Sequence, residues 1–249
     1  MAPADVSPPA AASPQVIAMH GWAGDSRQWR LLAAPLEARG WRWCGGERGY
    51  GDQPPEPPRW RGPGRKVVIA HSLGPHLLPA EVWAAADAVV LLASFGRFLP
   101  AGVAGRRLRA ALAGMDAALA DTASARAMLR SFLAEAAAPD PPSALPSGPA
   151  DGPLGPLQLE RLRADLALLE RTEGLPPGFP DGVPVLLVEA GEDRIVAPEA
   201  RALLRQALPR ATHLPLPGAG HALLTAPLVE PLLAWLDTGR LAPPTPGPR

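Results

Sequence analysis

The strongest constraint on the fold is a series of short, continuous apolar runs that recur along the chain between stretches of helical character. The runs are Gln15 to Met19, Trp41 to Cys44, Lys66 to Ala70, Ala88 to Ala93, Val183 to Val188 and, more weakly, Thr212 to Leu216. Unbroken runs of this length are typical of strands buried on both faces, as in a parallel sheet. Helices are favoured at residues 25–39, 73–86, 198–208 and 222–240. The alternation predicts an α/β fold, with a mostly parallel central sheet flanked by helices.

Residues 96–180 break this alternation and predict a helical cap inserted between two strands of the sheet. Leucine, methionine and phenylalanine recur there at helical spacings, which places them on one face of each helix. The three helices are expected at residues 103–119, 121–138 and 157–172. Residues 139–156 are rich in proline, alanine and glycine, so we expect a mobile loop within the cap.

The domain organisation follows from these elements. We expect an α/β core formed by residues 15–95 and 181–241, with the cap at 96–180 between its two parts. Residues 1–14 and 242–249 are rich in proline and are expected to form a disordered arm and a disordered tail.

The balance of charge excludes several classes of partner. The 249 residues include 24 Lys+Arg and 24 Asp+Glu, so no global basic field is available to attract nucleic acid or an anionic membrane.

No apolar stretch reaches the ~18 residues of a transmembrane helix, and residues 1–15 lack the pattern of a secretory signal. The expectation is a monomeric protein of the cytoplasm. Its one cysteine, Cys44, excludes an internal disulfide.

The strongest local motif is Ala70-His71-Ser72-Leu73-Gly74, which follows an apolar run and leads into a helical stretch. A serine at a sharp strand-to-helix turn needs small residues two positions to either side, because larger ones would make the strand and the helix collide. The start of the helix directs backbone N–H groups at the site and favours a developing negative charge. The usual pattern is G-x-S-x-G, and here alanine, which is still small, replaces the first glycine. Pro79 predicts that the following helix is short or kinked.

Serine is a weak nucleophile at neutral pH and needs a base. His221 follows the last predicted strand, and Asp193 stands at the end of the strand before it. The order Ser72, Asp193, His221, with each residue just beyond the carboxyl end of a strand, predicts a Ser–Asp–His triad on an open α/β sheet. Glu192 is the rival for the acid. The alternative interpretation is that Asp193 is a turn residue paired with Arg194, and that His221 caps a helix.

The turn after the first strand, His20-Gly21-Trp22, predicts an oxyanion site. It can aim the backbone N–H of Trp22 at the same point as the backbone N–H of Leu73. Each such donor is typically worth ~2.7–4 kcal/mol of transition-state stabilisation. His20 is expected to orient this turn rather than to act as a second base, and it is also a candidate for substrate or carrier binding. The glycine-rich residues 45–51 lack the lysine and the helix of a phosphate-binding loop and predict a flexible loop.

The motifs HGW (20–22), AHSLG (70–74), GEDRIV (191–196) and GAGHALL (218–224) make this chain resemble the α/β-hydrolase superfamily. The resemblance covers nearly all of the chain except the two tails and the 139–156 loop. The stretch HGWAGDSRQW (20–29) is similar to the biotin-pathway pimeloyl-acyl-carrier-protein methyl ester carboxylesterases. This resemblance implies that Trp22 and Leu73 donate the two oxyanion hydrogen bonds. The chain departs from the family in Ala70 and in its long, proline-rich cap.

The same family uses basic residues on the cap to grip the acidic carrier protein. The candidates here are Arg106, Arg107 and Arg109 in the first cap helix, with Arg126 and Arg130 in the second. On a helical wheel the first three lie opposite or beside the apolar face, so all three can be exposed together. Arginine suits phosphate and carboxylate groups, which allows an acidic partner to dock. The alternative is a solvated helix face in an arginine-rich protein.

The resemblance implies a serine carboxylesterase that hydrolyses the methyl ester of a carrier-bound acyl chain and needs no cofactor. No cluster of His, Asp and Glu has the spacing of a metal site. On the same scaffold the alternatives are a small-ester or thioester hydrolase and an elimination like that of the menaquinone pathway, because a fold does not decide the reaction. A hydrolase-like protein that binds a ligand without turnover is the alternative from a different class.

Overall fold

The computed structural model describes residues 12–224, 227–239 and 241, so the predicted tail and most of the predicted arm lie outside the described residues. The strands are β1 (Gln15–Met19), β2 (Arg42–Gly46), β3 (Lys66–His71), β4 (Ala88–Leu92), β5 (Val185–Ala190) and β6 (Thr212–Leu216). Within the described residues these six strands form one sheet in the order β2-β1-β3-β4-β5-β6, with every neighbouring pair parallel. The predicted α/β class is confirmed.

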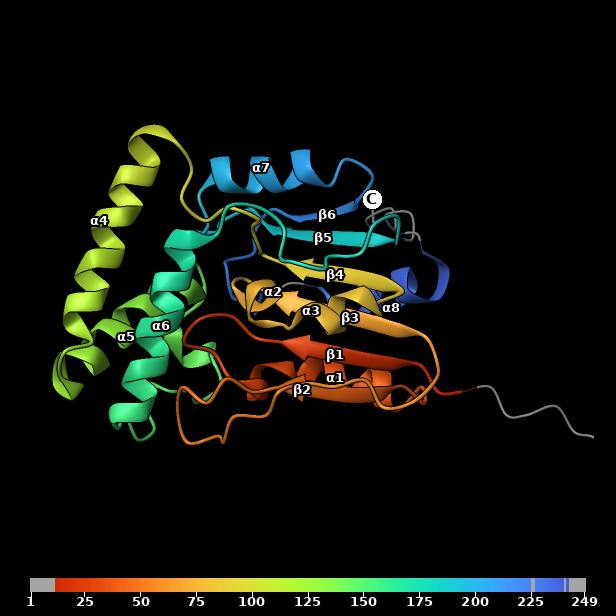
Figure 1. Ribbon diagram of the computed structural model, residues 1–249, viewed down its shortest axis with the longest axis horizontal. Helices are drawn as coiled ribbons and strands as arrows, with labels where there is room; N and C mark the ends of the chain where they lie inside the picture. Colours follow the sequence, from red (N-terminus) through yellow and green to blue (C-terminus); the bar gives the residue numbers. More distant parts are fainter. Residues whose placement is uncertain (1–11, 225–226, 240, 242–249) are drawn as a thin grey trace, which may run out of the picture.

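The helices cover both faces of the sheet and one of its ends (Figure 1). The short helices are η1 (Ser26–Trp29), α2 (Gly74–Leu77), α3 (Ala80–Ala84) and η2 (Pro142–Ala144). The longer ones are α1 (Arg30–Glu37), α4 (Gly102–Ala118), α5 (Thr122–Ala137), α6 (Pro156–Arg171), α7 (Pro198–Ala207) and α8 (Val229–Thr238). None of the helices in the described ranges combines the length and the apolar character that a membrane crossing needs.

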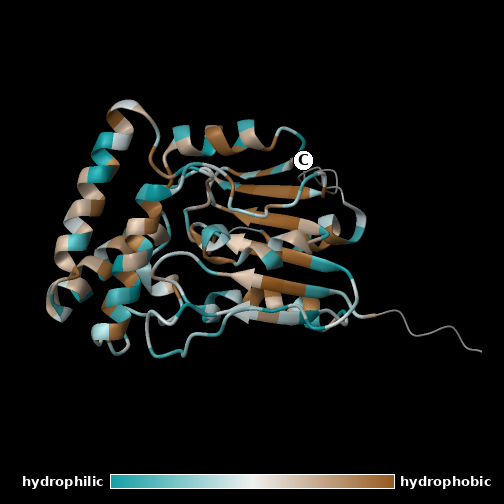
Figure 2. Cartoon of the chain, viewed as in Figure 1, coloured by the Kyte–Doolittle hydropathy of each residue, from teal (hydrophilic) through white to brown (hydrophobic). Residues whose placement is uncertain are grey.

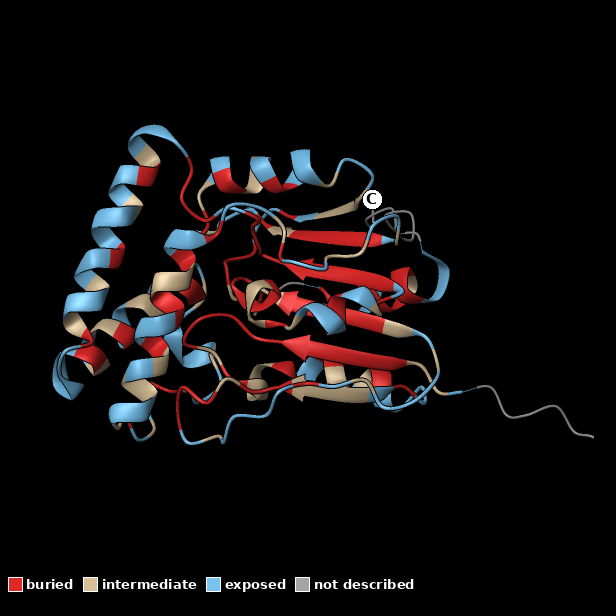
Figure 3. Ribbon diagram, viewed as in Figure 1, coloured by how far each residue is buried: buried red, intermediate tan, exposed pale blue. Residues whose placement is uncertain are grey.

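The central strands β1, β3, β4 and β5 are buried on both faces, as their continuous apolar runs predict. Along β1, Val16 and Ala18 pack with side chains of α1 and α8, while Ile17 and Met19 pack on the other face with side chains of α3 and α7. Figure 2 shows the central strands β1, β3, β4 and β5 as mainly hydrophobic. Figure 3 shows these central strands buried and the edge strands β2 and β6 only partly buried, whereas cap helix α4 is largely exposed. The sheet is therefore a rigid platform for residues at its carboxyl edge.

Two helical stretches differ from the simple prediction. The stretch predicted at 73–86 divides into α2 and α3, because Leu78 (φ −87°, ψ 139°) and Pro79 (φ −71°, ψ 152°) are extended. Proline disfavours the helical conformation in the residue before it, so the predicted short helix is confirmed. Helix α8 begins at Val229 rather than near residue 222, and Leu223 in the preceding turn has a left-handed φ of 54°.

The predicted cap consists of α4, α5 and α6, which lie together beyond the ends of β1 and β3 at the left of Figure 1. The segment 139–156, expected to be a mobile loop, has packed positions within it. Ala150 and Leu154 are buried, and Arg126 of α5 donates hydrogen bonds to the carbonyls of Ala150 (2.6 Å) and Gly152 (3.0 Å). These contacts fasten the second half of the segment to the cap.

Candidate active site

Ser72 occupies a strained turn between β3 and α2. Its φ is +55°, a left-handed conformation that a non-glycine residue rarely adopts and that costs about 1–3 kcal/mol. Backbone contacts hold it there: the Ser72 N–H donates to the Leu92 carbonyl (2.9 Å), and Ser94 Oγ donates to the Ser72 carbonyl (2.7 Å). The turn lifts the serine from the end of the strand toward a cavity, as a nucleophile elbow requires.

Small residues let the elbow approach the first strand. A Cβ atom on Gly74 would lie 2.3 Å from the carbonyl oxygen of Met19, and one on Gly21 would lie 2.8 Å from the Cβ of Ser72. Ala70, which replaces the usual glycine, is fully buried in β3 and pairs with Met19. The methyl group of alanine therefore fits at the position where the sequence departs from the pattern.

The imidazole of His221 joins Ser72 to Asp193. Ser72 Oγ lies 3.0 Å from His221 Nε2, and His221 Nδ1 lies 2.9 Å from Asp193 Oδ2. Both Ser72 and His221 are buried. In this arrangement the serine hydroxyl donates to Nε2 while Nδ1–H donates to the carboxylate. The structure thus brings together the three residues that the sequence selected from three distant loops.

The second oxygen of Asp193 is also occupied. Asp193 Oδ1 accepts from the backbone N–H groups of Ile195 (2.8 Å) and Val196 (2.9 Å), which fixes the carboxylate. Burial opposes the charged form, but His221 and these two N–H groups outweigh it and lower the pKa of Asp193. The rival acid Glu192 is exposed, and its carboxylate makes no hydrogen bond or ion pair among the described residues.

His71 lies beside His221. Its ring centroid is 4.9 Å from that of His221, and its Nε2 lies 2.9 Å from the His221 carbonyl oxygen. Burial, together with the charge of His221, lowers the pKa of His71 to about 3. A neutral His71 can support the His221 loop without placing a positive charge next to the His221 ring.

The two expected oxyanion donors are the backbone N–H groups of Trp22 and Leu73. Among the described residues, no hydrogen bond takes up the backbone N–H of Trp22 or that of Leu73. The side chain of Trp22 contacts two cap helices. Its indole N–H donates to the Leu162 carbonyl of α6 (2.8 Å), and its ring packs edge-on against Phe132 of α5, with the ring centroids 4.9 Å apart. The turn that carries one expected donor is therefore fastened to α5 and α6.

His20 is fully buried and contacts backbone groups on both sides of its ring. Its Nδ1 lies 2.9 Å from the Gly21 carbonyl oxygen, and its Nε2 accepts the backbone N–H of Arg48 (3.1 Å). The Oε1 atom of Glu47 lies 3.4 Å from the same Nε2. These contacts suit the predicted orienting role, and the ring is not among the groups that line the cavity beside Ser72.

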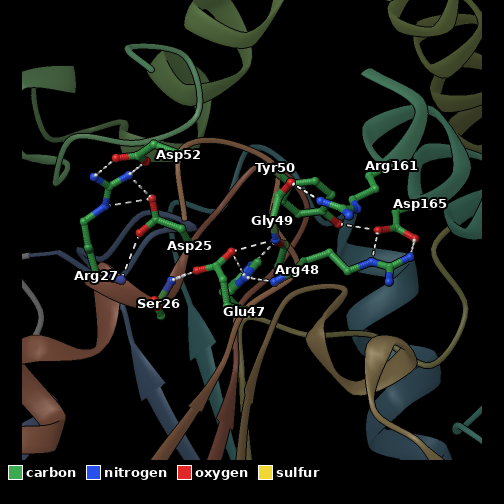
Figure 4. Close-up of polar contacts among 12 residues, drawn as sticks. Asp25, Ser26, Arg27, Glu47, Arg48, Gly49, Tyr50, Asp52, Arg161 and Asp165 are labelled. Carbon is green, nitrogen blue, oxygen red and sulfur yellow. Dashed lines mark hydrogen bonds and ion pairs between the residues drawn. The ribbon is translucent and has the colours of Figure 1, made fainter. Parts of the chain in front are cut away.

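The glycine-rich residues 45–51 are mostly buried and hydrogen-bonded, which differs from the flexible loop that their composition predicts. Gly45 and Gly46 extend β2 by pairing with β1. Glu47, which is 5 % exposed, accepts from the backbone N–H groups of Ser26 (2.8 Å) and Gly49 (2.8 Å), as Figure 4 shows. Burial alone would raise the pKa of Glu47, but its polar surroundings, these two N–H groups among them, lower it to about 2.

Sequence reasoning missed the polar cluster that continues from this segment into the cap. Asp165 of α6 accepts hydrogen bonds from Arg48 and Tyr50 (Figure 4). The hydrogen bond to Asp165 raises the pKa of Arg48, while burial and the charge of Asp165 raise that of Tyr50 well above its ordinary value. Tyr50 thus stays a neutral donor. The only signal in the sequence was a carboxylate on the otherwise apolar face of a predicted helix.

A cavity of about 420 Å³ lies against Ser72 and His221. Its wall is mostly apolar and includes Trp22, Trp29, Leu32, Phe132, Leu133, Leu145, Leu223 and Leu228. Two arginines also line it. Arg27 is neutralised by Asp25 (2.5 Å) and Asp52 (2.9 Å), whereas Arg30 is exposed and has no ion pair among the described residues. The space suits an apolar group attached to the carbonyl that Ser72 would attack.

The cap arginines chosen from the sequence lie away from this cavity. Arg106, Arg107 and Arg109 are exposed on α4, and none of them lines it. Arg109 has a distant ion pair with Glu170 (4.0 Å). Arg130 is exposed on α5, whereas Arg126 is engaged by backbone carbonyls of the cap. The guanidinium of Arg126 is therefore a structural tie, which argues against the docking role suggested for it.

Comparison with solved structures shows the fold. A bromoperoxidase from Bacillus anthracis matches with a TM-score of 0.63 at 15% identity, over 91% of this chain and 93% of that one. An α/β hydrolase fold protein from Burkholderia ambifaria matches with a TM-score of 0.58 at 18% identity, over 92% of both chains. An esterase from Exiguobacterium antarcticum matches with a TM-score of 0.59 at 16% identity, over 92% of this chain and 94% of that one.

No family model and no curated protein matches the sequence. The similarity to solved structures nevertheless extends across the core and the cap together, because each match covers more than nine-tenths of this chain. The chain adopts the α/β-hydrolase fold, with a helical cap beyond the carboxyl ends of its parallel sheet.

Proposed function

We propose that this protein is a serine hydrolase that cleaves carboxylic esters. The observation that supports the proposal is the continuous chain of contacts from Ser72 Oγ through His221 to Asp193, beside an apolar cavity. A serine hydroxyl becomes an effective nucleophile when an adjacent imidazole accepts its proton and a carboxylate fixes the imidazole tautomer. A ligand-binding protein without turnover would have no need of this alignment.

The proposed reaction proceeds in two halves. Ser72 Oγ attacks the ester carbonyl while His221 Nε2 takes the hydroxyl proton, and the imidazolium is stabilised by Asp193. The carbonyl oxygen becomes an oxyanion that the backbone N–H groups of Trp22 and Leu73 stabilise. His221 then gives its proton to the departing alkoxide, which leaves as an alcohol. Water, activated by the same imidazole, releases the carboxylic acid and restores the serine.

We further propose, from the sequence resemblance, that the ester is the methyl ester of an acyl chain bound to an acyl carrier protein, as in pimeloyl-acyl-carrier-protein methyl ester. The apolar cavity can bury the methylene groups of such a chain, with a gain of about 0.8 kcal/mol per buried CH₂. The exposed arginines of α4, namely Arg106, Arg107 and Arg109, are the proposed docking site for the acidic carrier. The protein acts as a monomer in the cytoplasm in this proposal.

Turnover of matched substrates tests the proposal. The methyl ester of a carrier-linked acyl chain, the free methyl ester and the corresponding thioester are compared for the native protein, for Ser72→Ala and for the triple change of the α4 arginines to glutamate. Hydrolysis of both methyl esters that Ser72→Ala abolishes supports the ester hydrolase. A preference for the thioester would favour that alternative, and turnover that survives Ser72→Ala would refute the mechanism.

The carrier-docking proposal has its own control in this experiment. The triple change to glutamate at Arg59, Arg61 and Arg210 alters the net charge equally, at exposed positions near the amino ends of the strands. The expected result is a rise of about tenfold in KM for the carrier-linked ester with the α4 variant alone, and no change for the free ester. Equal rates for carrier-linked and free esters in the native protein and in the α4 variant would remove the docking proposal.

A further inference from the structure

Asp165 is a buried carboxylate on cap helix α6 whose partners all belong to the core of the protein. It is 3 % exposed. Its two oxygens accept a bidentate pair of hydrogen bonds from Arg48, at 2.5 Å from Nε and 2.8 Å from Nη2, and a third from the Tyr50 hydroxyl at 2.7 Å. Figure 4 shows Asp165 reaching from α6 to the segment that follows β2. A bidentate arginine–carboxylate pair fixes direction as well as distance, so this contact restrains where residue 48 lies.

The same side of α6 contacts the core at two further points. Arg161 Nη1 donates to the Gly49 carbonyl (3.0 Å), and the Leu162 carbonyl accepts the indole N–H of Trp22 (2.8 Å). Residues 161, 162 and 165 are neighbours on one face because residues three and four apart stack on a helix. One face of α6 therefore holds both the segment after β2 and the turn after β1.

The segment after β2 in turn holds the predicted oxyanion turn. The backbone N–H of Arg48 donates to His20 Nε2 (3.1 Å), which leaves the ring proton on Nδ1, and Nδ1 donates to the Gly21 carbonyl (2.9 Å). The Gly21 carbonyl and the Trp22 N–H belong to one peptide unit, which is planar and rigid. Fixing the direction of this carbonyl therefore fixes the direction of the N–H that we assign to the oxyanion.

We propose that Asp165 is a positioning residue for this oxyanion donor, acting through Arg48 and His20. The inference rests on the proposed function, since it concerns how the same site stabilises negative charge. Oxyanion donors are effective because they are oriented before the reaction, and a modest misalignment forfeits much of their benefit. The cap thus contributes to the chemistry through the oxyanion turn, in addition to covering the cavity.

The substitution Asp165→Asn tests the proposal because it removes the charge and one arginine contact while keeping the size of the side chain. The matched control is Asp116→Asn, which removes an exposed cap ion pair with Arg163 (2.9 Å), a residue of the same helix α6. Arg48→Gln serves as a second variant because the arginine side chain is 39% exposed, so its replacement is tolerated by folding more easily. All measurements are made at a temperature at which every variant is folded by circular dichroism.

Three measured constants, kcat, KM and the inhibition constant of a ketone, distinguish a positioning role of Asp165 from a purely structural one. For Asp165→Asn and Arg48→Gln we expect kcat to fall about tenfold and KM to change less than about twofold, because an interaction used only in the transition state is weakened. The inhibition constant of a trifluoromethyl ketone, which forms a tetrahedral oxyanion on the serine, should rise by the same factor of about ten. Binding of the alcohol analogue of that ketone, and all constants of Asp116→Asn, should stay unchanged.

Two results distinguish the possible failures. If the native protein hydrolyses esters through Ser72 but Asp165→Asn and Arg48→Gln keep native kcat and native ketone inhibition, Asp165 only stabilises the cap and the inference is wrong. If kcat falls without weaker ketone inhibition, the loss does not come from the oxyanion site, and the inference is again wrong. If the native protein has no serine-dependent turnover at all, it is the proposed function that fails.

Discussion

The backbone N–H of Ala222 donates a hydrogen bond of 2.9 Å to the carbonyl of Ala136, so the last turn of cap helix α5 holds the loop that carries His221. The proposed base, His221, is therefore held by two contacts. One is this bond to cap helix α5, and the other joins its carbonyl oxygen to Nε2 of His71 at the end of β3. The approach of the two segments is close, and this makes the loop sensitive to small changes in side-chain volume.

Gly220 is the residue at which this sensitivity is greatest. A Cβ atom there would lie 1.8 Å from the Ala138 carbonyl oxygen, whereas a Cβ atom on Gly218 would meet nothing within 4 Å. Gly220→Ala should displace the loop, lower kcat about 10- to 100-fold and reduce the free energy of unfolding by about 1–3 kcal/mol. Gly218→Ala is the matched control. Native kinetics in Gly220→Ala would show that the loop can shift without moving the base.

The choice of acid is tested by a pair of adjacent substitutions. Asp193→Asn keeps the shape of the side chain but cannot hold the His221 tautomer in the same way, so kcat should fall by about 10³- to 10⁴-fold. Glu192→Gln removes the neighbouring exposed carboxylate and should change kcat less than about twofold. Steady-state kinetics of ester hydrolysis decide the matter. The reverse order of effects would assign the acid to Glu192.

The turn that we propose for the oxyanion site has no room for a side chain at Gly21. A Cβ atom there would lie 2.8 Å from Ser72 Cβ and 3.3 Å from Ser72 Oγ, so Gly21→Ala should push the turn and the nucleophile apart. We expect kcat to fall by at least about 100-fold, because both attack and charge stabilisation depend on this spacing. Gly24→Ala is the control, since its nearest contact is the flexible end of Gln28 at 3.0 Å. A small effect of Gly21→Ala would contradict the packing argument.

Glu47 predicts a specific dependence of stability on pH. Its pKa is about 2 in the folded protein against an ordinary value of 4.5, so the folded state binds its proton less tightly than the unfolded state. The resulting stability is present in full above about pH 4.5 and is lost as the pH falls toward 2. Each unit of pKa difference corresponds to about 1.4 kcal/mol, so the contribution is on the order of 3 kcal/mol at neutral pH.

Urea unfolding of the native protein and of Glu47→Gln measures this contribution. The difference in free energy of unfolding between the two should shrink by about 2 kcal/mol between pH 6 and pH 3. The exposed carboxylate Glu199 supplies the control variant, Glu199→Gln, whose difference from the native protein should stay nearly constant. A constant difference for Glu47→Gln as well would mean that its carboxylate is not preferentially charged in the folded state.

The sequence was sufficient to predict the sheet and the chain order of the proposed triad. Buried parallel strands such as β3 and β4 are continuous apolar runs, and residues that follow such strands meet at one edge. The positions of Ser72, Asp193 and His221, each just after an apolar run, therefore predict that the three side chains meet at that edge. The break between α2 and α3 could also be predicted, because Pro79 disfavours the helical conformation of Leu78, the residue directly before it.

The polar cluster between the core and the cap could not be predicted in this way. Arg48 and Asp165 are separated by 117 positions, and their contact depends on how α6 is oriented over the sheet. Composition suggested a flexible loop around Tyr50, because glycine is common there. Burial of Glu47 and its bonds to backbone N–H groups order this segment, and neither follows from the local pattern.

The most direct test of the central claim is covalent labelling of the folded protein with a fluorophosphonate, read by intact mass and by the position of the modified peptide. We predict one adduct per chain, on Ser72, with labelling abolished in Ser72→Ala and strongly slowed in His221→Asn. Absence of any adduct on the folded native protein, or undiminished labelling of Ser72→Ala, would contradict the claim that Ser72 is a nucleophile activated by His221.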